Sequence, residues 1–262
     1  MMKKFTLFSV VLFSCIACKK DGNLDILSKN EFKVDSLLVK DSIKIGESLK
    51  LNYESTILTF PTLEDKTLLD SIYAPYTKLK DYSEQSIQKY IQTEKNSFFN
   101  SIKDQHSSWM VSAGYTDQWY EKSQMKVKSN INDFLHIQYQ INSYMGGAHG
   151  NYGYREKVFD LDNNKRLVLS DITTISKDEL SKLLFEHLNA NKKPLQTVKV
   201  SEMLLVDKIP VTDNFYFDKD NLYFHYSPYE ITAYAAGDVT IPIPWNAIKN
   251  TLNSDFASRM KL

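Results

Sequence analysis

The chain has 262 residues, with 32 basic side chains, 32 acidic side chains and 13% aromatic residues. This balance excludes a strong net field that would draw the protein to nucleic acid or to an anionic membrane. The aromatic content argues against a disordered chain.

The N-terminus predicts an export signal. Lys3 and Lys4 precede an apolar run over residues 5–16, which is shorter than the roughly 20 residues that a membrane-spanning helix needs. Ala17 is a small residue directly before Cys18, as at a signal-peptide cleavage site.

The four residues that end in Cys18 resemble a lipobox, with Cys15 where leucine is usual. We therefore expect residues 1–17 to be a lipoprotein signal peptide, and Cys18 to carry palmitate-type acyl chains. The polar residues 18–30 would form the lipidated tether. An ordinary signal peptide cut nearby is the alternative. After cleavage at Cys18 the ectodomain has no thiol, which excludes a disulfide, a cysteine-ligated zinc site and a cysteine nucleophile.

Alternating apolar and polar residues predict two strands, over residues 32–39 and 49–60. The period then changes to that of a helix, which we expect to begin after Ser83 and to end near Lys103. Its apolar positions recur at helical spacing and predict a core-facing stripe: Ile87, Tyr90, Ile91, Phe98, Phe99 and Ile102.

Strand character returns over residues 109–115, 118–130 and 134–144, and a glycine turn follows at 146–151. The remaining chain predicts two hairpins, a capped helix, and a final strand and helix. These are strands 158–161 and 166–169, a capping box at 176–179, strands 215–217 and 222–226, strand 239–243, and a helix opening at Pro244. Strands clustered around a few helices, without regular βαβ alternation, predict an α+β fold.

The residues themselves show no catalytic or cofactor motif: we find no nucleophile elbow, zinc-protease motif, phosphate loop or dinucleotide fingerprint. Asp160, Asp162, Asn164 and Asp171 imitate the spacing of a calcium loop. Lys165 stands where such a loop needs glycine, so a plain hairpin turn explains these residues better. We expect no cofactor and no metal.

Two segments place the chain near a known family. Residues 144–151 read Tyr-Met-Gly-Gly-Ala-His-Gly-Asn, and residues 226–237 contain Pro-Tyr-Glu-Ile. Both resemble signatures of a bacterial envelope family that includes the N-terminal domain of the peptidoglycan deacetylase PdaC and the extracellular sensor domain of the anti-sigma factor RsiV. The order of the blocks agrees over about residues 49–252.

The resemblance implies an α+β fold in two adjoining parts, mostly antiparallel sheet packed with a few helices. We expect a PdaC-like part over residues 31–155 and an RsiV-like part over residues 156–262. In the anti-sigma branch this module binds lysozyme; in the deacetylase branch it accompanies a separate catalytic domain. We identify neither that catalytic domain nor a sigma-binding segment in the sequence, so a tethered binding module is expected.

The leading hypothesis is a non-enzymatic lipoprotein of the cell envelope, anchored to the outer membrane or cell surface of a Gram-negative bacterium. Its partner would be a lysozyme-type muramidase or a peptidoglycan fragment. Tyrosines suit recognition loops because they offer a large contact area at small entropic cost. We therefore expect partner contacts at Pro228, Tyr229, Glu230, Tyr234 and His149.

Other interpretations stay open at this point. The two tyrosines are equally typical of a buried corner that holds strands together, and His149 of a bond to a backbone carbonyl. A wall-polymer hydrolase or esterase would use His149 with Asp171 or Asp160. A structural lipoprotein of envelope assembly would need no small ligand.

Overall fold

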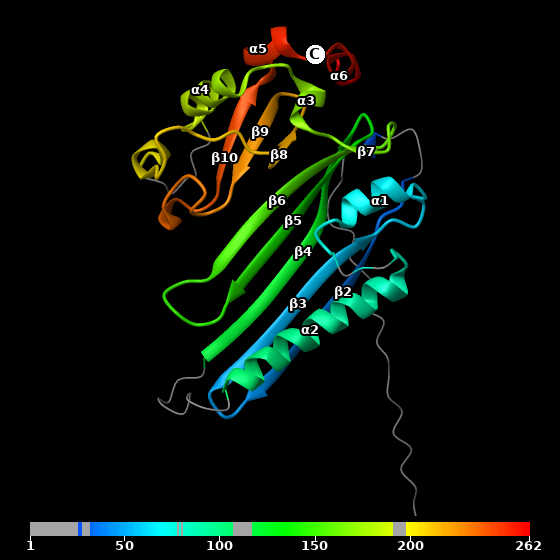
Figure 1. Ribbon diagram of the computed structural model, residues 1–262, viewed down its shortest axis with the longest axis vertical. Coiled ribbons are helices and arrows are strands. Elements are labelled where there is room, and N and C mark those ends of the chain that lie inside the picture. The colour runs from blue at the N-terminus through cyan, green and yellow to red at the C-terminus, as the bar shows by residue number, and fades with distance from the viewer. Residues whose placement is uncertain (1–25, 28–31, 78, 80, 107–116, 191–197) are drawn as a thin grey trace, which may run out of the picture.

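The computed structural model describes residues 26–27, 32–77, 79, 81–106, 117–190 and 198–262. Within these ranges one sheet has seven strands and a second has three, with helices packed against both, which confirms the α+β prediction (Figure 1). The predicted signal peptide, Cys18 and the predicted strand 109–115 lie outside the described residues. None of the helices in the described ranges is long and apolar enough to cross a membrane.

The large sheet has the order β2-β3-β4-β5-β6-β7, and β1 pairs with the far end of β4. Its strands are β1 (Ile26–Leu27), β2 (Asp35–Ile45), β3 (Leu49–Thr59), β4 (Asp117–Ile131), β5 (Phe134–Tyr144), β6 (Asn151–Asp160) and β7 (Lys165–Arg166). β1 falls within the segment expected to be the tether. β3 and β4 are parallel, so the chain needs a crossover between them, and α1 (Lys66–Tyr73) and α2 (Glu84–His106) lie on it.

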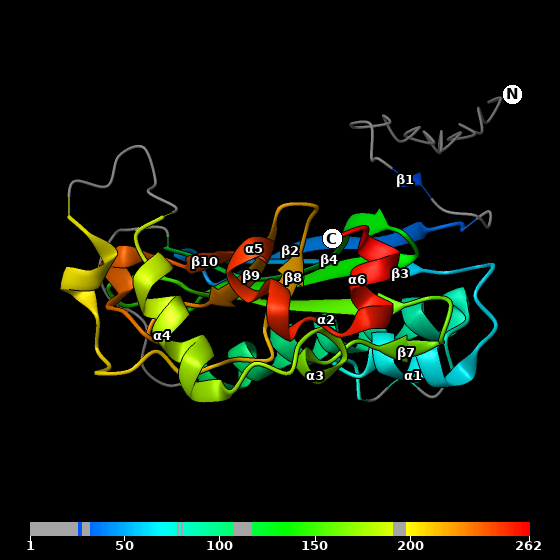
Figure 2. The ribbon, with the colours of Figure 1, turned by 90° about the horizontal axis from the view of Figure 1, so that it is seen from above.

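Helix α2 covers one face of the large sheet and builds the first core. It begins after Ser83, as predicted, and the Ser83 hydroxyl accepts a hydrogen bond from the Ser86 N–H (3.2 Å). The helix runs along β2 and β3, and α1 lies on the same side of the sheet (Figures 1 and 2). Five of the six predicted stripe residues are buried, and Tyr90 is half-buried. Each fully buried aliphatic side chain contributes about 1.5–3 kcal/mol.

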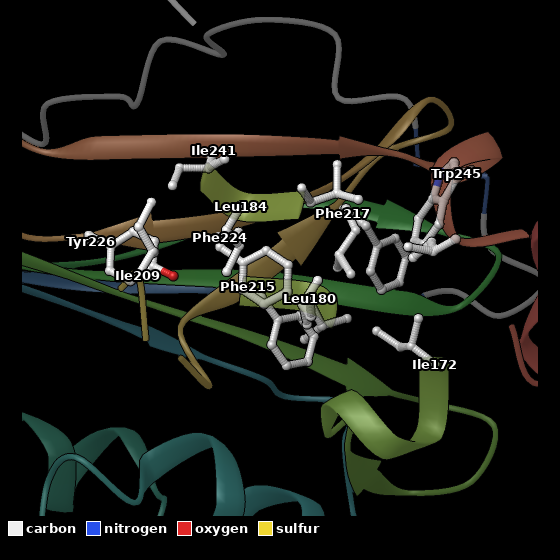
Figure 3. Close-up of a cluster of buried hydrophobic side chains, with 14 of the residues drawn as sticks. Ile172, Leu180, Leu184, Ile209, Phe215, Phe217, Phe224, Tyr226, Ile241 and Trp245 are labelled. Carbon is white, nitrogen blue, oxygen red and sulfur yellow. The ribbon is translucent and has the colours of Figure 1, made fainter. Parts of the chain in front are cut away.

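The second core belongs to the C-terminal part of the chain (Figure 3). It lies between the three-stranded sheet, the helices around it and the ends of β5 and β6. The elements are β8 (Phe215–Phe217), β9 (Asn221–Tyr226), β10 (Val239–Pro244), α3 (Leu169–Ile172), α4 (Lys177–His187), α5 (Trp245–Ile248), α6 (Ser254–Met260) and three single 3-10 turns (Val200–Met203, Tyr234–Ala236, Lys249–Thr251). The capping box predicted at Ser176 and Glu179 is present at the start of α4.

Strands β5 and β6 contribute side chains to both cores because successive residues of a strand point to opposite faces. Leu135 and Phe159 are fully buried in the first core. Their neighbours Phe134 and Val158 are buried in the second. A slip of one residue in this pairing would exchange the two sets, so the register of β5 and β6 is strongly specified.

One predicted strand is shorter than expected. Residues 166–169 were predicted as strand, but only Lys165 and Arg166 pair with β6. The Asp171 carboxylate accepts a hydrogen bond from the Val168 N–H (2.8 Å) and so starts α3 at Leu169. A side chain that bonds a nearby backbone N–H competes in this way with the sheet ladder.

The outer edge of β6 is closed by two side chains that flank strands of the small sheet, Asn214 before β8 and Ser227 after β9. β7 pairs only with the last two residues of β6, which leaves an open edge that sheets normally protect. The Asn214 amide donates to the Tyr154 carbonyl (3.0 Å) and accepts from the Glu156 N–H (2.5 Å). The Ser227 hydroxyl accepts from the Tyr154 N–H (3.0 Å). These bonds join the two sheets, and the expected division after residue 155 falls inside β6.

Candidate binding surface

The Pro-Tyr-Glu-Ile segment forms a tight turn directly after β9. The Glu230 N–H donates to the Ser227 carbonyl (3.1 Å), and the Glu230 carboxylate accepts from the Ser227 N–H (2.9 Å). Pro228 and Tyr229 are therefore the central residues of a β-turn. The φ of Tyr229 is 69°, a value that glycine normally supplies at the third position of a type II turn.

This turn holds the Tyr229 ring in an unfavourable backbone conformation. A non-glycine residue with a left-handed backbone costs of order 1–3 kcal/mol and persists where its surroundings fix it. The Tyr229 side chain is 57% exposed, so core packing does not explain its presence. The buried-corner interpretation is therefore wrong for Tyr229.

The glycine turn between β5 and β6 presents His149 to the same surface. Gly146 and Gly147 have φ values of 87° and 95°, as the expected left-handed turn requires. A side chain on Gly146 would also meet the Trp119 ring at 3.2 Å. The turn is thus shaped by its glycines, and His149 is exposed at its end.

His149 lies among the tyrosines of the neighbouring loop. Its ring stacks on Tyr234 with 3.8 Å between centroids, and the Tyr229 hydroxyl lies 3.3 Å from its Nε2. Nδ1 lies 2.9 Å from the Gly150 carbonyl, which only accepts, so Nδ1 donates. In the tautomer that carries its proton on Nδ1, Nε2 accepts from the Tyr229 hydroxyl. The bond to a backbone carbonyl considered above is therefore present beside the aromatic contacts.

Tyr234 holds the His149 ring in place through stacking and through a hydrogen bond to the same turn. It is half-buried, and its hydroxyl donates to the Gly150 carbonyl (2.9 Å). Two segments about 80 residues apart in the chain thus meet in one exposed cluster of His149, Tyr229 and Tyr234, which we call the aromatic surface. Pro228 sets the turn, and Glu230 closes it.

A buried polar cluster lies between β5, β6 and β9. The carboxylate of Glu156, 1% exposed, lies 2.7 Å from His136 Nε2 through one oxygen and 2.7 Å from His225 Nδ1 through the other. His225 Nε2 in turn lies 3.4 Å from the Asp238 carboxylate. Gln138 donates to Glu156 as well (2.7 Å).

The charges in this cluster follow from its contacts. Burial raises the pKa of Glu156, but hydrogen bonds from His136, His225 and Gln138 outweigh it and lower the pKa to about 2. Burial lowers the pKa of His225, yet its bonds to Asp238 and Glu156 raise it overall. Burial dominates at His136 and lowers its pKa. Glu156 is thus ionised at neutral pH. Its contacts favour the protonated form of His225, whereas burial favours the neutral form of His136.

Aromatic rings connect the two features. Tyr154 stacks on His225, with 4.8 Å between centroids. From there to the surface each ring touches the next in the series Tyr154, Tyr152, Tyr234, His149 and Tyr229. Neither His225 nor Glu156 was among the site residues expected from the sequence. The strand predicted at residues 158–161 begins at Asn151 in the structure, so Glu156 lay outside the predicted strand. The signal in the sequence was limited to one histidine in each of two predicted strands, over residues 134–144 and 222–226.

The residues of the hydrolase hypothesis do not meet. His149 precedes the start of β6 and Asp160 ends it, about 30 Å away for a strand of this length. The Asp160 carboxylate pairs with Arg259 (2.7 Å), and Asp171 pairs with Lys165 (2.7 Å). Both carboxylates therefore hold the hairpin and its surroundings.

The hairpin interpretation of the calcium-like spacing is confirmed by the pairing of Asp160 with Lys165. Asp162 lies 3.1 Å from the Arg259 guanidinium, so an arginine occupies the side of the turn that a cation would need. In the described ranges no group of three or more His, Cys, Asp or Glu side chains has the arrangement of a metal site.

A family model matches the C-terminal part of the chain, which contains the Tyr229 turn. Residues 169–246, from α3 into α5, match the family model described as "Protein of unknown function (DUF3298)". The match contains the Tyr229 turn but not His149. The search of curated proteins gave no match.

Two solved structures are similar over most of the chain. A DUF3298 family member from Bacteroides fragilis NCTC 9343 is 26% identical, with a TM-score of 0.73, and the match covers 88% of this chain and 98% of that one. A DUF3298 family protein from Pseudomonas aeruginosa PAO1 is 18% identical, with a TM-score of 0.56, and covers 87% and 97%. The second likeness shows the fold alone. The resemblance to PdaC and RsiV stays a prediction; the chain carries a DUF3298 match over its C-terminal part and shares its fold with two proteins described by that name.

Proposed function

We propose that the protein is a non-enzymatic binding module of the cell envelope, whose aromatic surface contacts a wall-associated protein of the lysozyme type. The observation that carries the proposal is the exposed Tyr229 ring, held at positive φ against His149. Strained backbone of this kind clusters at functional sites.

The composition of the surface supports a protein partner. Tyrosines are enriched among interface residues that dominate binding energy, and here they are fixed in advance by Pro228 and by the Tyr234 hydrogen bond. Met145, in the same turn as His149, is also 45% exposed. A partner would therefore meet a preorganised patch that loses little side-chain entropy on binding.

A titration of the protein with a c-type lysozyme tests the proposal directly. We expect micromolar or tighter binding, about −8 kcal/mol, and at least a 30-fold loss for Tyr229→Ala and His149→Ala, since central interface residues contribute about 2 kcal/mol or more. Phe185→Ala is the matched control, because Phe185 is an aromatic residue of α4 that is 52% exposed. Unchanged binding in both surface variants would refute the role of the aromatic surface.

Peptidoglycan fragments form the second arm of that experiment. If muropeptides bind and lysozyme does not, the partner is the wall polymer. If neither binds, the module has another role, and a structural lipoprotein of envelope assembly becomes the better hypothesis.

We also propose that the chain is exported and anchored through a lipidated Cys18, at the outer membrane or cell surface. The support is the basic and apolar N-terminus that ends in Ala17 and Cys18. Metabolic labelling with a palmitate analogue should mark the native protein and not Cys18→Ser. Equal labelling of both would overturn this part of the proposal.

A further inference from the structure

A cavity of about 800 Å³ lies beside the outer edge of β6. Residues of β5, β6 and β7 line one side, and residues 212–214 line the other together with Ser227, Pro228 and Glu230. Its size is that of sites for small ligands in other proteins. It shares Ser227, Pro228 and Glu230 with the turn that carries Tyr229, but the two sites have different chemistry.

Three basic side chains gather in this cavity. Arg155 and Lys157 alternate along β6 with Tyr154 and Glu156, so they project from the face opposite the buried polar cluster. Arg166 joins them from β7, and all three line the cavity.

No carboxylate of the described residues offsets the charges of these cations. Among the residues that the structure describes, no carboxylate lies within ion-pair distance of Arg155, Lys157 or Arg166. Lys157 is only 6% exposed, and its ammonium makes one long hydrogen bond, to the Ser71 carbonyl (3.3 Å). The Nε of Arg166 is buried with no hydrogen-bond partner.

This arrangement is costly in the absence of an anion. A buried charge needs a paired charge or several hydrogen bonds to offset the loss of hydration. Lys157 has the Tyr139 ring at 5.4 Å, a contact that supplies only part of that compensation. Burial, with the nearby charges of Arg166 and Arg155, lowers the pKa of Lys157 to about 8.

Acidic residues lie on the other side of the cavity and do not neutralise the basic one. Asp213 and Glu230 line it, and the Glu230 carboxylate already accepts the Ser227 N–H. A negatively charged group therefore meets attraction at the β6 side and repulsion at the loop side, which orients a ligand within the cavity.

We propose that this cavity binds a small ligand through an oxyanion, either a carboxylate or a phosphate group, which Lys157 and Arg166 hold while Arg155 contacts it at the rim. The guanidinium of Arg166 would donate from its buried Nε, since arginine matches oxyanions with paired N–H donors. The inference goes beyond the proposed function and does not depend on lysozyme binding.

Calorimetric titration of the full protein with inorganic phosphate and with N-acetylmuramic acid tests the site, with N-acetylglucosamine as the uncharged comparison. We expect at least one of the two anions to bind and the neutral sugar to bind at least tenfold more weakly. Tighter binding of N-acetylmuramic acid would identify the natural oxyanion as a carboxylate. Tighter binding of phosphate would identify it as a phosphate group.

Variants locate the binding. Lys157→Met and Arg166→Met should each weaken anion binding at least tenfold and leave the fold intact, because each removes an unpaired charge and keeps the aliphatic stem. Lys126→Met, on an exposed position of β4, is the control for net charge and should bind as the native protein does. If neither anion binds, or if both cavity variants bind as tightly as the native protein, the proposal is wrong.

Discussion

Replacing Tyr229 with glycine separates the contribution of this residue to binding from its contribution to folding. The φ of 69° is free for glycine, so Tyr229→Gly relieves about 1–2 kcal/mol of backbone strain. Two losses oppose this gain. The greater freedom of glycine in the unfolded chain costs about 0.5–1 kcal/mol. The lost ring contacts with His149 and Tyr234 cost about 0.5–1 kcal/mol. We expect a free energy of unfolding within about 1 kcal/mol of the native value.

Urea denaturation measures that change, and Tyr226→Ala provides the contrast. Tyr226 is 1% exposed in the second core and donates to the Pro210 carbonyl (2.7 Å). Its truncation should cost roughly 3–5 kcal/mol, as for other buried aromatic residues.

The same Tyr229→Gly protein is then titrated with lysozyme. A loss of at least 30-fold in affinity, with stability unchanged, is the expected result. If Tyr229→Gly instead lowers the free energy of unfolding by more than 2 kcal/mol, the ring is a structural element and the strain argument fails. Native affinity in a stable Tyr229→Gly protein would equally refute the reasoning.

Three further substitutions test the surroundings of the aromatic surface. Gly146→Ala adds a Cβ at positive φ against the Trp119 ring and should lower the free energy of unfolding by about 1–3 kcal/mol; native stability in thermal unfolding would contradict the turn geometry. Asn214→Ala uncovers buried backbone groups at the β6 edge and should cost roughly 2–4 kcal/mol, with faster amide exchange confined to that strand; uniform exchange would contradict it. Glu156→Gln removes the anion beside His225 and should cost roughly 3 kcal/mol at neutral pH. Because the pKa of Glu156 is lowered from 4.5 to about 2, its contribution is complete above pH 4.5 and falls as the pH drops toward 2. The stability difference between variant and native protein should shrink over that interval, and a constant difference would refute the assignment of charge.

The local pattern of the chain was sufficient for most of the secondary structure. The helical spacing after Ser83 predicted α2, and alternation predicted β5 with the bounds that the structure shows. The capping box at Ser176 marked the start of α4. These predictions succeed because capping and periodicity depend on neighbours within a few residues.

Short elements without a strong period were missed. α1 has eight residues and depends on the Asp65 side chain, which accepts the Leu68 N–H (2.8 Å). α6 has seven residues and is fixed by the burial of Phe256 and Met260 in the second core. Helices this short are marginal by themselves, so tertiary packing decides them.

The sequence by itself determined the α+β class, the glycine turn after β5, and the residue types that this turn and the Pro-Tyr-Glu-Ile segment expose. Only the tertiary structure decided that His149 and Tyr234, 85 positions apart, stack on each other. The same is true of the Glu156 carboxylate, which lies within hydrogen-bond distance of histidines from two other strands. Contacts of this kind depend on which strands become neighbours and in which register. That choice is made by the packing of two whole cores, and no local run of residues encodes it.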